Sequence, residues 1–288
     1  MAIKMLHDGE LRILDYRCES GPGDVPFTEV QERYSLSYVR RGSFGCRTLG
    51  RDFELITGAF LLGCPDDDYL CTHDHHDCGD ECLSIQLAPE LWDALGGKRK
   101  TWRIGALPPL ADIAVVAELA QAAASGATDI GVDEAGLALA VRFMRAGSDG
   151  PPPSRKLPGA HLRRIIVNVA DWIALHSEEP IGLRQAATQA GLSSYHFLRT
   201  FRQVLGLTPH QYLIRCRLRR AARWLLEDDA TPITTVALGV GFEDISNFVR
   251  SFHRAAGCSP RGYRALASSG RNIYQEVMER ICFTPPTR

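Results

Sequence analysis

The chain has 288 residues, a length that favours two domains over one. Its 45% hydrophobic and 23% charged residues exclude global disorder. No run of 18 apolar residues occurs and the first residues lack the apolar stretch of a signal peptide, so we expect a cytoplasmic protein with no membrane partner. In that setting the nine cysteines are expected to be thiols or metal ligands rather than a disulfide framework.

The net charge of −1 hides a division between the two halves of the chain. Residues 1–154 carry 14 Lys or Arg against 24 Asp or Glu, whereas residues 155–288 carry 19 against 10. Lys156 is the only lysine of the second half, and arginine suits bidentate contacts to phosphates and guanine edges. The pattern indicates an acidic module joined to a nucleic-acid-binding one. A solvated, arginine-rich helical surface is the alternative.

In the first half, residues 34–87 contain short segments rich in β-branched and aromatic residues, separated by glycines. This pattern predicts short antiparallel strands. Alanine- and leucine-rich windows at 113–124 and 132–145 have apolar residues at helical spacing, which predicts two helices that close the first domain. Three prolines and two glycines within 147–154 predict a linker.

A dense group of possible metal ligands lies within the strand region. If residues 69–72 and 81–87 pair as a hairpin, Cys71 and Cys82 approach each other and Cys64 can return from the preceding turn. Thiolate and imidazole groups at this density suit zinc or another thiophilic metal. The expected ligands are drawn from Cys64, Cys71, His73, His75, Cys78 and Cys82.

Two other interpretations of this group stay open. A thiol switch is one, because exposed cysteines near histidines can be reactive. An acidic polar loop with packed cysteines is the other, because the spacing matches no tight paired-cysteine zinc motif. The remaining cysteines are isolated in the sequence and are interpreted as packing residues: Cys18, Cys46, Cys216, Cys258 and Cys282.

The second half is predicted to be almost entirely helical. Helices are expected near 161–176, 183–190, 194–205, 208–228, 233–239, 244–256 and 260–267. Within this region residues 190–202 match residues 240–253 as an internal repeat. In each copy an alanine-bearing helix is followed by a glycine-containing turn, a polar N-cap and a helix with two phenylalanines four residues apart. These are the parts of a helix-turn-helix.

The phenylalanines anchor one face of each second helix, so the residues between them project outward and can reach base edges. The outward set is Ser194, Tyr195, Leu198 and Arg199 in the first copy, and Asp244, Ile245, Ser246, Asn247 and Arg250 in the second. Arginine pairs with guanine, asparagine with adenine, and apolar groups with thymine methyls. A phosphate or a nearby carboxylate is the alternative partner of either arginine.

Residues 160–267 resemble the DNA-binding domain of the AraC/XylS family of transcription regulators. The resemblance rests on several motifs, among them Phe197–Arg202, Gly206–Tyr212, Val240–Phe242, Phe248–Phe252 and Gly257–Arg264. It implies two helix-turn-helix units joined by a long helix, with recognition helices in successive major-groove segments about 34 Å apart. Family members with an additional amino-terminal domain often carry a cupin-like β-barrel that senses a ligand or mediates dimerisation. The strand-rich segment is similar to that arrangement by pattern and position.

We therefore expect an α+β protein. A cupin-like β-barrel with trailing helices is placed at 1–146, a linker at 147–159, an all-α double helix-turn-helix domain at 160–267 and a tail at 268–288. The expected function is sequence-specific regulation of transcription, by activation or repression, under control of a metal, small-molecule or thiol redox signal at the first domain. The expected partners are double-stranded DNA, the transcription machinery, an effector and a second copy of the chain.

No catalytic role is expected, because the sequence contains no Ser/His/Asp arrangement, phosphate loop or dinucleotide fingerprint. Two alternatives remain. One is a metal-dependent cupin enzyme fused to DNA-binding helices, which would need an open coordination position and a substrate pocket. The other is a constitutive DNA-binding protein with a purely structural barrel.

Overall fold

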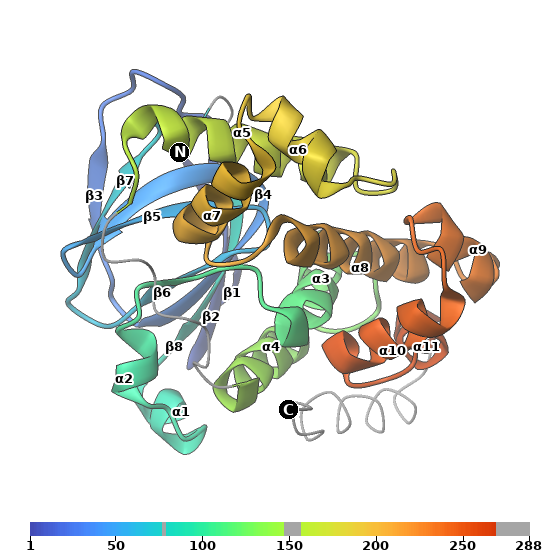
Figure 1. Cartoon of the computed structure of the whole chain (residues 1–288). Helices are drawn as coiled ribbons and strands as arrows, with labels where there is room; N and C mark the ends of the chain where they lie inside the picture. Colours follow the sequence, from blue (N-terminus) through green and yellow to red (C-terminus); the bar gives the residue numbers. More distant parts are fainter. Residues whose placement is uncertain (77–78, 147–156, 269–288) are drawn as a thin grey trace.

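A computed structural model describes residues 1–76, 79–146 and 157–268 (Figure 1). The protein is α+β, with a large antiparallel sheet in its amino-terminal part and helices in its carboxyl-terminal part. The strands are β1 (Ala2–His7), β2 (Leu11–Cys18), β3 (Phe27–Val30), β4 (Tyr34–Thr48), β5 (Arg51–Ile56), β6 (Phe60–Gly63), β7 (Asp68–Thr72), β8 (Asp80–Leu87) and β9 (Ala106–Leu107). The helices are α1 (Pro89–Ala94), α2 (Arg99–Trp102), α3 (Ala111–Ser125), α4 (Val132–Ala146), α5 (Ala160–Leu175), α6 (Leu183–Gln189), α7 (Ser194–Leu205), α8 (Pro209–Glu227), α9 (Ile233–Gly239), α10 (Ile245–Ala256) and α11 (Pro260–Ser268).

The 15-residue strand β4 organises the sheet. Its first half pairs with β8 and β6, and its second half pairs with β5 and β7. Between the halves the register to β8 shifts after Val39, and Gly42 has a φ of +71°, a left-handed conformation that favours glycine. The strand therefore bends, and its two halves pair with different strands.

The strands follow the path β1-β2-β8-β4-β6-β9, with β3, β5 and β7 paired to one side. Among the described residues these pairings leave free edges and do not close into a ring. The coarse prediction of an antiparallel sheet followed by helices is confirmed, and a closed cupin-like barrel is not. The strands before residue 34 were not predicted, and β4 is longer than the short strands expected.

The two faces of the sheet bury different apolar clusters. Residues such as Ile13, Leu36 and Ile85 share a cluster with α3 and α4. Phe44 and Leu55 belong to a second cluster, together with Cys46, Cys71 and Cys82. The alternation follows from the period of two along a strand, which sends successive side chains to opposite faces.

The helix predictions are confirmed closely. The windows at 113–124 and 132–145 correspond to α3 and α4, and each helix expected in the second half corresponds to one of α5 to α11, with ends that differ by no more than two residues. Helices α1 and α2 were not predicted. Most of the predicted linker, residues 147–156, and the tail from residue 269 lie outside the described residues.

The helices of the second half pack directly onto the first half. Helix α3 contacts both α8 and α10, and α5 and α7 contact β5. One apolar cluster contains Leu119 and Phe143 from the first half together with Leu218 and Phe248 from the second. In the part of the chain that is described, no helix has the length and apolar character needed to cross a bilayer.

Candidate nucleic-acid interface

The two predicted helix-turn-helix units have matching local geometry. In the first unit the Ser193 hydroxyl caps α7 by accepting a hydrogen bond from the backbone N–H of His196 at 3.3 Å. In the second, the Asp244 carboxylate caps α10 by accepting one from the N–H of Ser246 at 2.8 Å. Each cap satisfies a donor that the first turn of a helix leaves unpaired.

A glycine makes the turn before each capped helix. Gly191 has a φ of +64° and Gly241 has a φ of +96°. Residues with a side chain rarely adopt these backbone conformations. At Gly241 a Cβ atom would also lie 2.7 Å from the carbonyl oxygen of Glu178. The turns therefore depend on glycine for conformation, and the second depends on it for space as well.

Two phenylalanines fix each of these helices to the protein. The ring centroids of Phe197 and Phe201 are 5.5 Å apart, those of Phe248 and Phe252 are 5.6 Å apart, and all four side chains are fully buried. In both units the next aromatic partner is the tyrosine of the repeat, Tyr212 or Tyr263. The inward face predicted from the spacing is therefore the observed one.

The outward residues of α7 and α10 lie at the surface. Tyr195 is 77% exposed, and Arg199, Asn247 and Arg250 are exposed as well. Ser194 and Leu198 are half-buried, while Asp244, Ile245 and Ser246 are exposed. Contact of this set with DNA stays a prediction. The Asp244 carboxylate already bonds to its own helix, a structural role that competes with one at a base.

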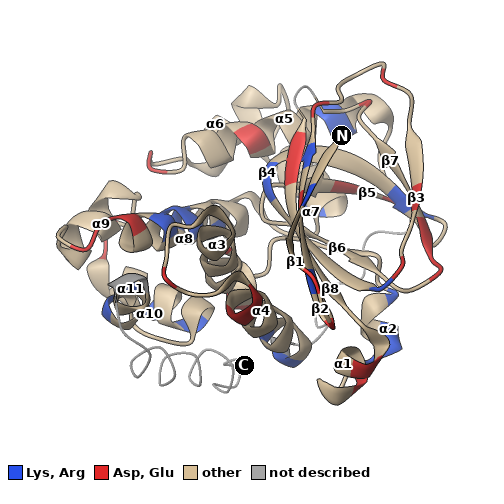
Figure 2. Ribbon diagram, turned by 180° about the vertical axis from the view of Figure 1, so that it is seen from behind, with Lys and Arg blue, Asp and Glu red and all other residues tan. Residues whose placement is uncertain are grey.

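Figure 2 shows basic residues along α8, and several of these arginines bond to groups within the protein. Arg217 donates to the carbonyl oxygens of Ser177 and Glu179 at 2.7 Å each. Arg215 donates to the carbonyl oxygen of Pro109, and Arg220 pairs with Glu178. Part of the basic surplus of the second half is therefore used in contacts within the protein.

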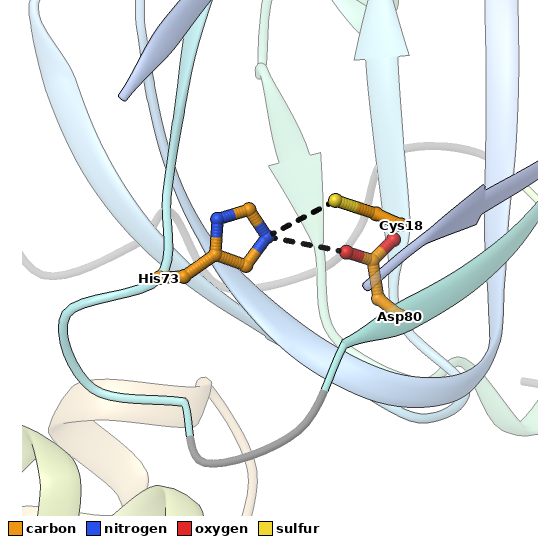
Figure 3. Close-up of side chains that lie close together, drawn as sticks. All are labelled: Cys18, His73 and Asp80. Carbon is orange, nitrogen blue, oxygen red and sulfur yellow. Dashed lines mark hydrogen bonds and ion pairs between the residues drawn. The ribbon is translucent and has the colours of Figure 1, made fainter. Parts of the chain in front are cut away.

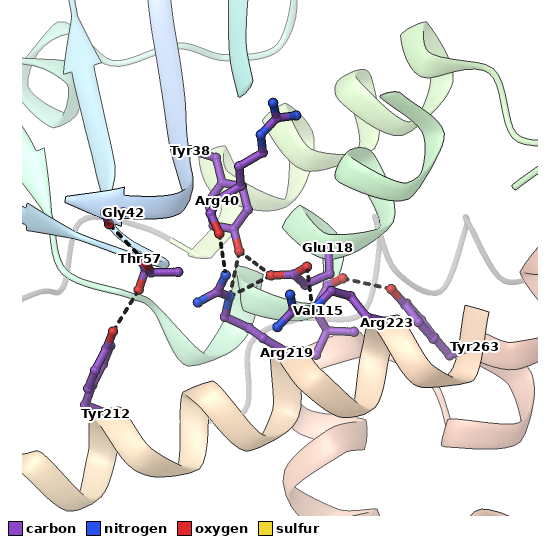
Figure 4. Close-up of polar contacts among 10 residues, drawn as sticks. All are labelled: Tyr38, Arg40, Gly42, Thr57, Val115, Glu118, Tyr212, Arg219, Arg223 and Tyr263. Carbon is purple, nitrogen blue, oxygen red and sulfur yellow. Dashed lines mark hydrogen bonds and ion pairs between the residues drawn. The ribbon is translucent and has the colours of Figure 1, made fainter. Parts of the chain in front are cut away.

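A buried polar cluster joins α8 to the first half (Figure 4). Arg219 Nε donates to Glu118 Oε1 at 2.6 Å and to the Tyr38 hydroxyl at 2.7 Å, and that hydroxyl donates to the same carboxylate oxygen at 2.5 Å. Burial alone would raise the pKa of Glu118, but Arg219 and Arg223 hold it below its ordinary value. We call Tyr38, Glu118 and Arg219 the junction cluster.

The tyrosines of the repeat add two further bonds at this junction. The hydroxyl of Tyr212 donates to the carbonyl oxygen of Thr57 at 3.3 Å, and that of Tyr263 donates to the carbonyl oxygen of Val115 at 3.0 Å. Both acceptors belong to the first half. Each helix-turn-helix unit is therefore tied to the amino-terminal part by the same position of its repeat.

A second polar contact joins the sheet to α5. Buried Glu54 on β5 lies 2.9 Å from His76 Nε2, 3.3 Å from His75 Nδ1 and 3.1 Å from Arg163 Nη1. Burial would raise the pKa of Glu54, but hydrogen bonds from the two histidines lower it to about 2. Arg164 also donates to the carbonyl oxygen of Asp74. The segment after β7 is thus attached to α5.

The predicted hairpin between residues 69–72 and 81–87 is wrong. Strand β7 pairs with β3 and β4, whereas β8 pairs with β2 and β4. Alternation along each strand could not reveal this, because it gives the faces of a strand but not its neighbours. Cys78 lies outside the described residues.

The structure distributes the expected metal ligands differently from the predicted grouping. The described members, Cys64, Cys71, His73, His75 and Cys82, are all buried. His75 faces Glu54, whereas His73 lies with Cys18 and Asp80. Within the described ranges, that trio is the one group of three candidate ligand atoms that lie within 4.8 Å of one another. The sequence interpretation missed Cys18, which it assigned to packing.

The surroundings of Cys71 and Cys82 argue against the thiol switch that the sequence left open. Burial raises the pKa of Cys71 and of Cys82, and in Cys82 the carboxylate of Asp80 adds to the effect. A raised pKa keeps a thiol protonated, and the thiolate is the reactive form. Exposed reactive thiols, the premise of that interpretation, do not describe these two residues.

Comparison with known proteins finds similarity in the second half of the chain. A profile described as a helix-turn-helix domain matches residues 186–266. The probable transcriptional regulator LumQ of Photobacterium leiognathi is 32% identical over 99 residues, which are 34% of this chain and 40% of that protein. The transcriptional activator RhaS of Shigella boydii is 37% identical over 93 residues, which are 32% of this chain and 33% of that protein.

A solved structure of the DNA-binding domain of AdpA with a target DNA is 33% identical, covers 35% of this chain and 89% of that one, and has a TM-score of 0.33. The match spans 40% or less of the length of LumQ and RhaS. The carboxyl-terminal helices of the present protein form two helix-turn-helix units, and the profile match spans both. The similarity to these named regulators falls in the part of the chain whose motifs resemble those of the AraC/XylS family.

Proposed function

We propose that the protein is a sequence-specific DNA-binding regulator of transcription whose amino-terminal domain receives a signal. The observation that carries the proposal is the attachment of α8 to the first domain. Helix α8 follows the first recognition helix, α7, and precedes the second, α10. Its Arg219 side chain lies in a buried cluster with Glu118 and Tyr38. A rearrangement of the sheet that moves Tyr38 must also change the surroundings of α8.

This arrangement supports the sensor over a constitutive DNA-binding protein. Allosteric control requires two sites whose states depend on each other, and a shared packed interface supplies that dependence. The apolar cluster containing Leu119 and Phe248 extends the same interface from α3 to α10. Both recognition helices, α7 and α10, therefore contact the first domain, so a change in that domain can alter their positions.

The likeness to named transcriptional regulators supports a role without catalysis. The expectation of a cupin-like sensor, and those of an effector, a second copy of the chain and the transcription machinery as partners, stay part of this proposal. A fused metal-dependent enzyme would show turnover of a substrate. A regulator needs only an affinity for DNA that depends on its ligand.

The proposal is tested by selecting binding sites for the full chain from a pool of random duplexes and measuring affinity for the selected sequence. We expect specific binding that weakens as salt rises. Arg199→Ala and Arg250→Ala should each weaken it. Arg47→Ala is the matched control, because Arg47 is an exposed arginine of the sheet that pairs with Asp52.

Recovery of no preferred sequence by the folded protein would contradict the proposal. Equal binding by the wild type and by both recognition-helix variants would show that α7 and α10 do not dock as described. Folding of every variant is checked by circular dichroism, so that lost affinity reflects the interface.

A further inference from the structure

Three buried side chains from separate parts of the first domain converge on one point (Figure 3). Cys18 ends β2 and Asp80 begins β8, and the two are direct partners in the antiparallel register of these strands. His73 follows the end of β7, which belongs to the other set of strands. None of the three is more than 8% exposed.

Two distances within this trio are close to those between neighbouring ligands of one ion. His73 Nε2 lies 3.7 Å from Cys18 Sγ and 3.4 Å from Asp80 Oδ1. Bonds to zinc of about 2.0–2.3 Å at tetrahedral angles put neighbouring ligand atoms roughly 3.3–3.6 Å apart. An ordinary N–H···O hydrogen bond is shorter, about 2.7–3.2 Å. A single ring nitrogen also has only one proton or one lone pair to share between the two partners.

The backbone is built to bring these residues together. A Cβ atom at Gly79 would lie 1.9 Å from the carbonyl oxygen of Cys18, and one at Gly42 would lie 2.0 Å from the carbonyl oxygen of Gly79. Only glycine at both positions lets the start of β8 pass this close to the end of β2 and to the bend of β4. The close approach of these strands therefore requires glycine at positions 42 and 79, whatever the three candidate ligands bind.

A cavity lies beside two of the three candidate ligands. It has a volume of about 50 Å³, enough for a water molecule, and is lined by Cys18, Asp80 and Cys82, among others, but not by His73. Cys82 Sγ lies 3.4 Å from the second carboxylate oxygen of Asp80, so it stands next to the trio. Sites with three protein ligands and one exchangeable position are typical of zinc where it is accessible to small ligands.

We propose that Cys18, His73 and Asp80 bind a thiophilic divalent cation, with zinc as the cation of choice, and that its binding is the signal of the amino-terminal domain. A thiolate, an imidazole and a carboxylate are all zinc ligands. The two negative charges of the thiolate and the carboxylate balance a divalent cation, and burial of unbalanced charge would be costly. The regulatory part of the proposal rests on the proposed function. The binding site does not.

The route from the site to the second half follows the segment after His73. The backbone carbonyl oxygen of Asp74 accepts a hydrogen bond from Arg164 of α5, and the next two residues, His75 and His76, both contact Glu54. Glu54 in turn pairs with Arg163 of α5. A cation that fixes His73 to Cys18 and Asp80 therefore restrains the segment that holds α5, the helix immediately before the first helix-turn-helix.

Binding is tested with the reduced, chelator-treated full chain and Co²⁺, which reports thiolate ligation by absorption, followed by displacement with Zn²⁺. We expect about one equivalent of Co²⁺ with a thiolate-to-cobalt charge-transfer band. Cys18→Ser should abolish the band, and His73→Gln and Asp80→Asn should weaken affinity at least about tenfold, the loss that even outer-shell changes cause. Cys64→Ser is the matched control, a buried cysteine outside the trio, and should keep the band.

X-ray absorption on the zinc-loaded wild type keeps the test decisive if a variant fails to fold. We expect one sulfur at about 2.3 Å and the remaining ligands to be nitrogen or oxygen at about 2.0–2.1 Å. Absence of metal uptake by the folded wild type would overturn the site. A shell of two or more sulfurs would overturn the ligand set, because Cys82, which lies next to the trio, would then be a ligand as well.

The regulatory role is tested by measuring affinity for the selected duplex with and without Zn²⁺. We expect a change of at least about fivefold in the wild type, and none in the double variant Arg163→Ala Arg164→Ala, which should still bind metal. Metal binding without any change in DNA affinity would overturn the regulatory role alone. Metal binding by a chain that selects no duplex would refute the proposed function and leave the metal site standing.

Discussion

Arg219 of α8 and Glu118 of α3 form a fully buried ion pair, with 2.6 Å between Nε and Oε1 and the Tyr38 hydroxyl bonded to both. Buried pairs stabilise a protein little compared with apolar residues of the same shape, but loss of one partner is costly. The pair also favours one relative position of α3 and α8, because a shift that separates Arg219 from Glu118 breaks a buried ion pair. We therefore expect it to define the arrangement of the two halves.

Removal of one partner gives the first prediction. Glu118→Ala should lower the free energy of unfolding by about 3–5 kcal/mol, because it leaves the buried Arg219 charge without its carboxylate partner. Glu178→Ala removes the half-exposed partner of Arg220 and should cost less than about 1 kcal/mol. Urea unfolding of the full chain measures both. Similar losses in the two variants would show that the buried ion pair contributes no more to the free energy of unfolding than an exposed one.

The acid side of the stability profile gives the second prediction. The pKa of Glu118 in the folded protein lies below its ordinary value of 4.5, so the unfolded chain binds the proton more readily. The carboxylate therefore contributes stability above about pH 4.5, and this contribution is lost as the pH falls through the folded pKa. Glu118→Gln should show a smaller loss of stability on acidification than the wild type. An unchanged pH dependence of unfolding in the variant would contradict this.

The tyrosines of the repeat give a third prediction. Tyr263→Phe removes a buried hydrogen bond to Val115 and should cost about 1 kcal/mol, while Tyr212→Phe, whose bond to Thr57 is longer at 3.3 Å, should cost less. Tyr195→Phe is the control, since this side chain is 77% exposed, and should leave the unfolding midpoint unchanged. A larger loss in Tyr212→Phe than in Tyr263→Phe would contradict the ranking.

The features that the sequence predicted well are local ones. A helix-turn-helix is specified within about twenty residues by caps, glycines and spacing, as in the run from Leu183 to Phe201. The same holds for the alanine-rich helices α3 and α4. Their ends could be placed within two residues because each helix depends on its own periodicity.

The features that the sequence did not predict depend on distant pairing. Cys18 meets Asp80 only because β2 pairs with β8, and nothing in the composition of either strand identifies the other. A pattern of alternation in residues 11–18 could have predicted β2, but not its partner. The ligand trio therefore requires the fold, whereas the density of histidine and cysteine near residue 73 was visible beforehand.

Charge was informative about the domain but not about the role of each residue. The arginine surplus of the second half indicated nucleic-acid binding, yet Arg217 and Arg219 point to carbonyl and carboxylate groups within the protein. Net charge is a sum over surface and interior, so it overstates the number of groups available to phosphates. The salt dependence of DNA binding should accordingly be smaller than a count of arginines suggests.

The last prediction concerns the positions in DNA that each recognition helix reads. Helix α8 has 19 residues and is about 28 Å long, so it separates the two units by a distance comparable to one turn of the duplex, about 34 Å. Arg199 on α7 and Asn247 on α10 should therefore read base pairs about ten positions apart. Arg199→Ala should remove about 1–3 kcal/mol of discrimination at one guanine and Asn247→Ala a similar amount at one adenine.

Affinities for single-base variants of the selected duplex measure this spacing. A phosphate contact would behave differently, since its loss weakens binding to every sequence and reduces the slope of log affinity against log salt by about 0.9. Gln185→Ala on α6 is a control for general effects of substitution in the domain, because Gln185 is exposed and lies outside the two recognition helices. If both variants relax the same base pair, the two helices do not occupy successive grooves. The separation set by α8 would then not be the geometry of the bound state.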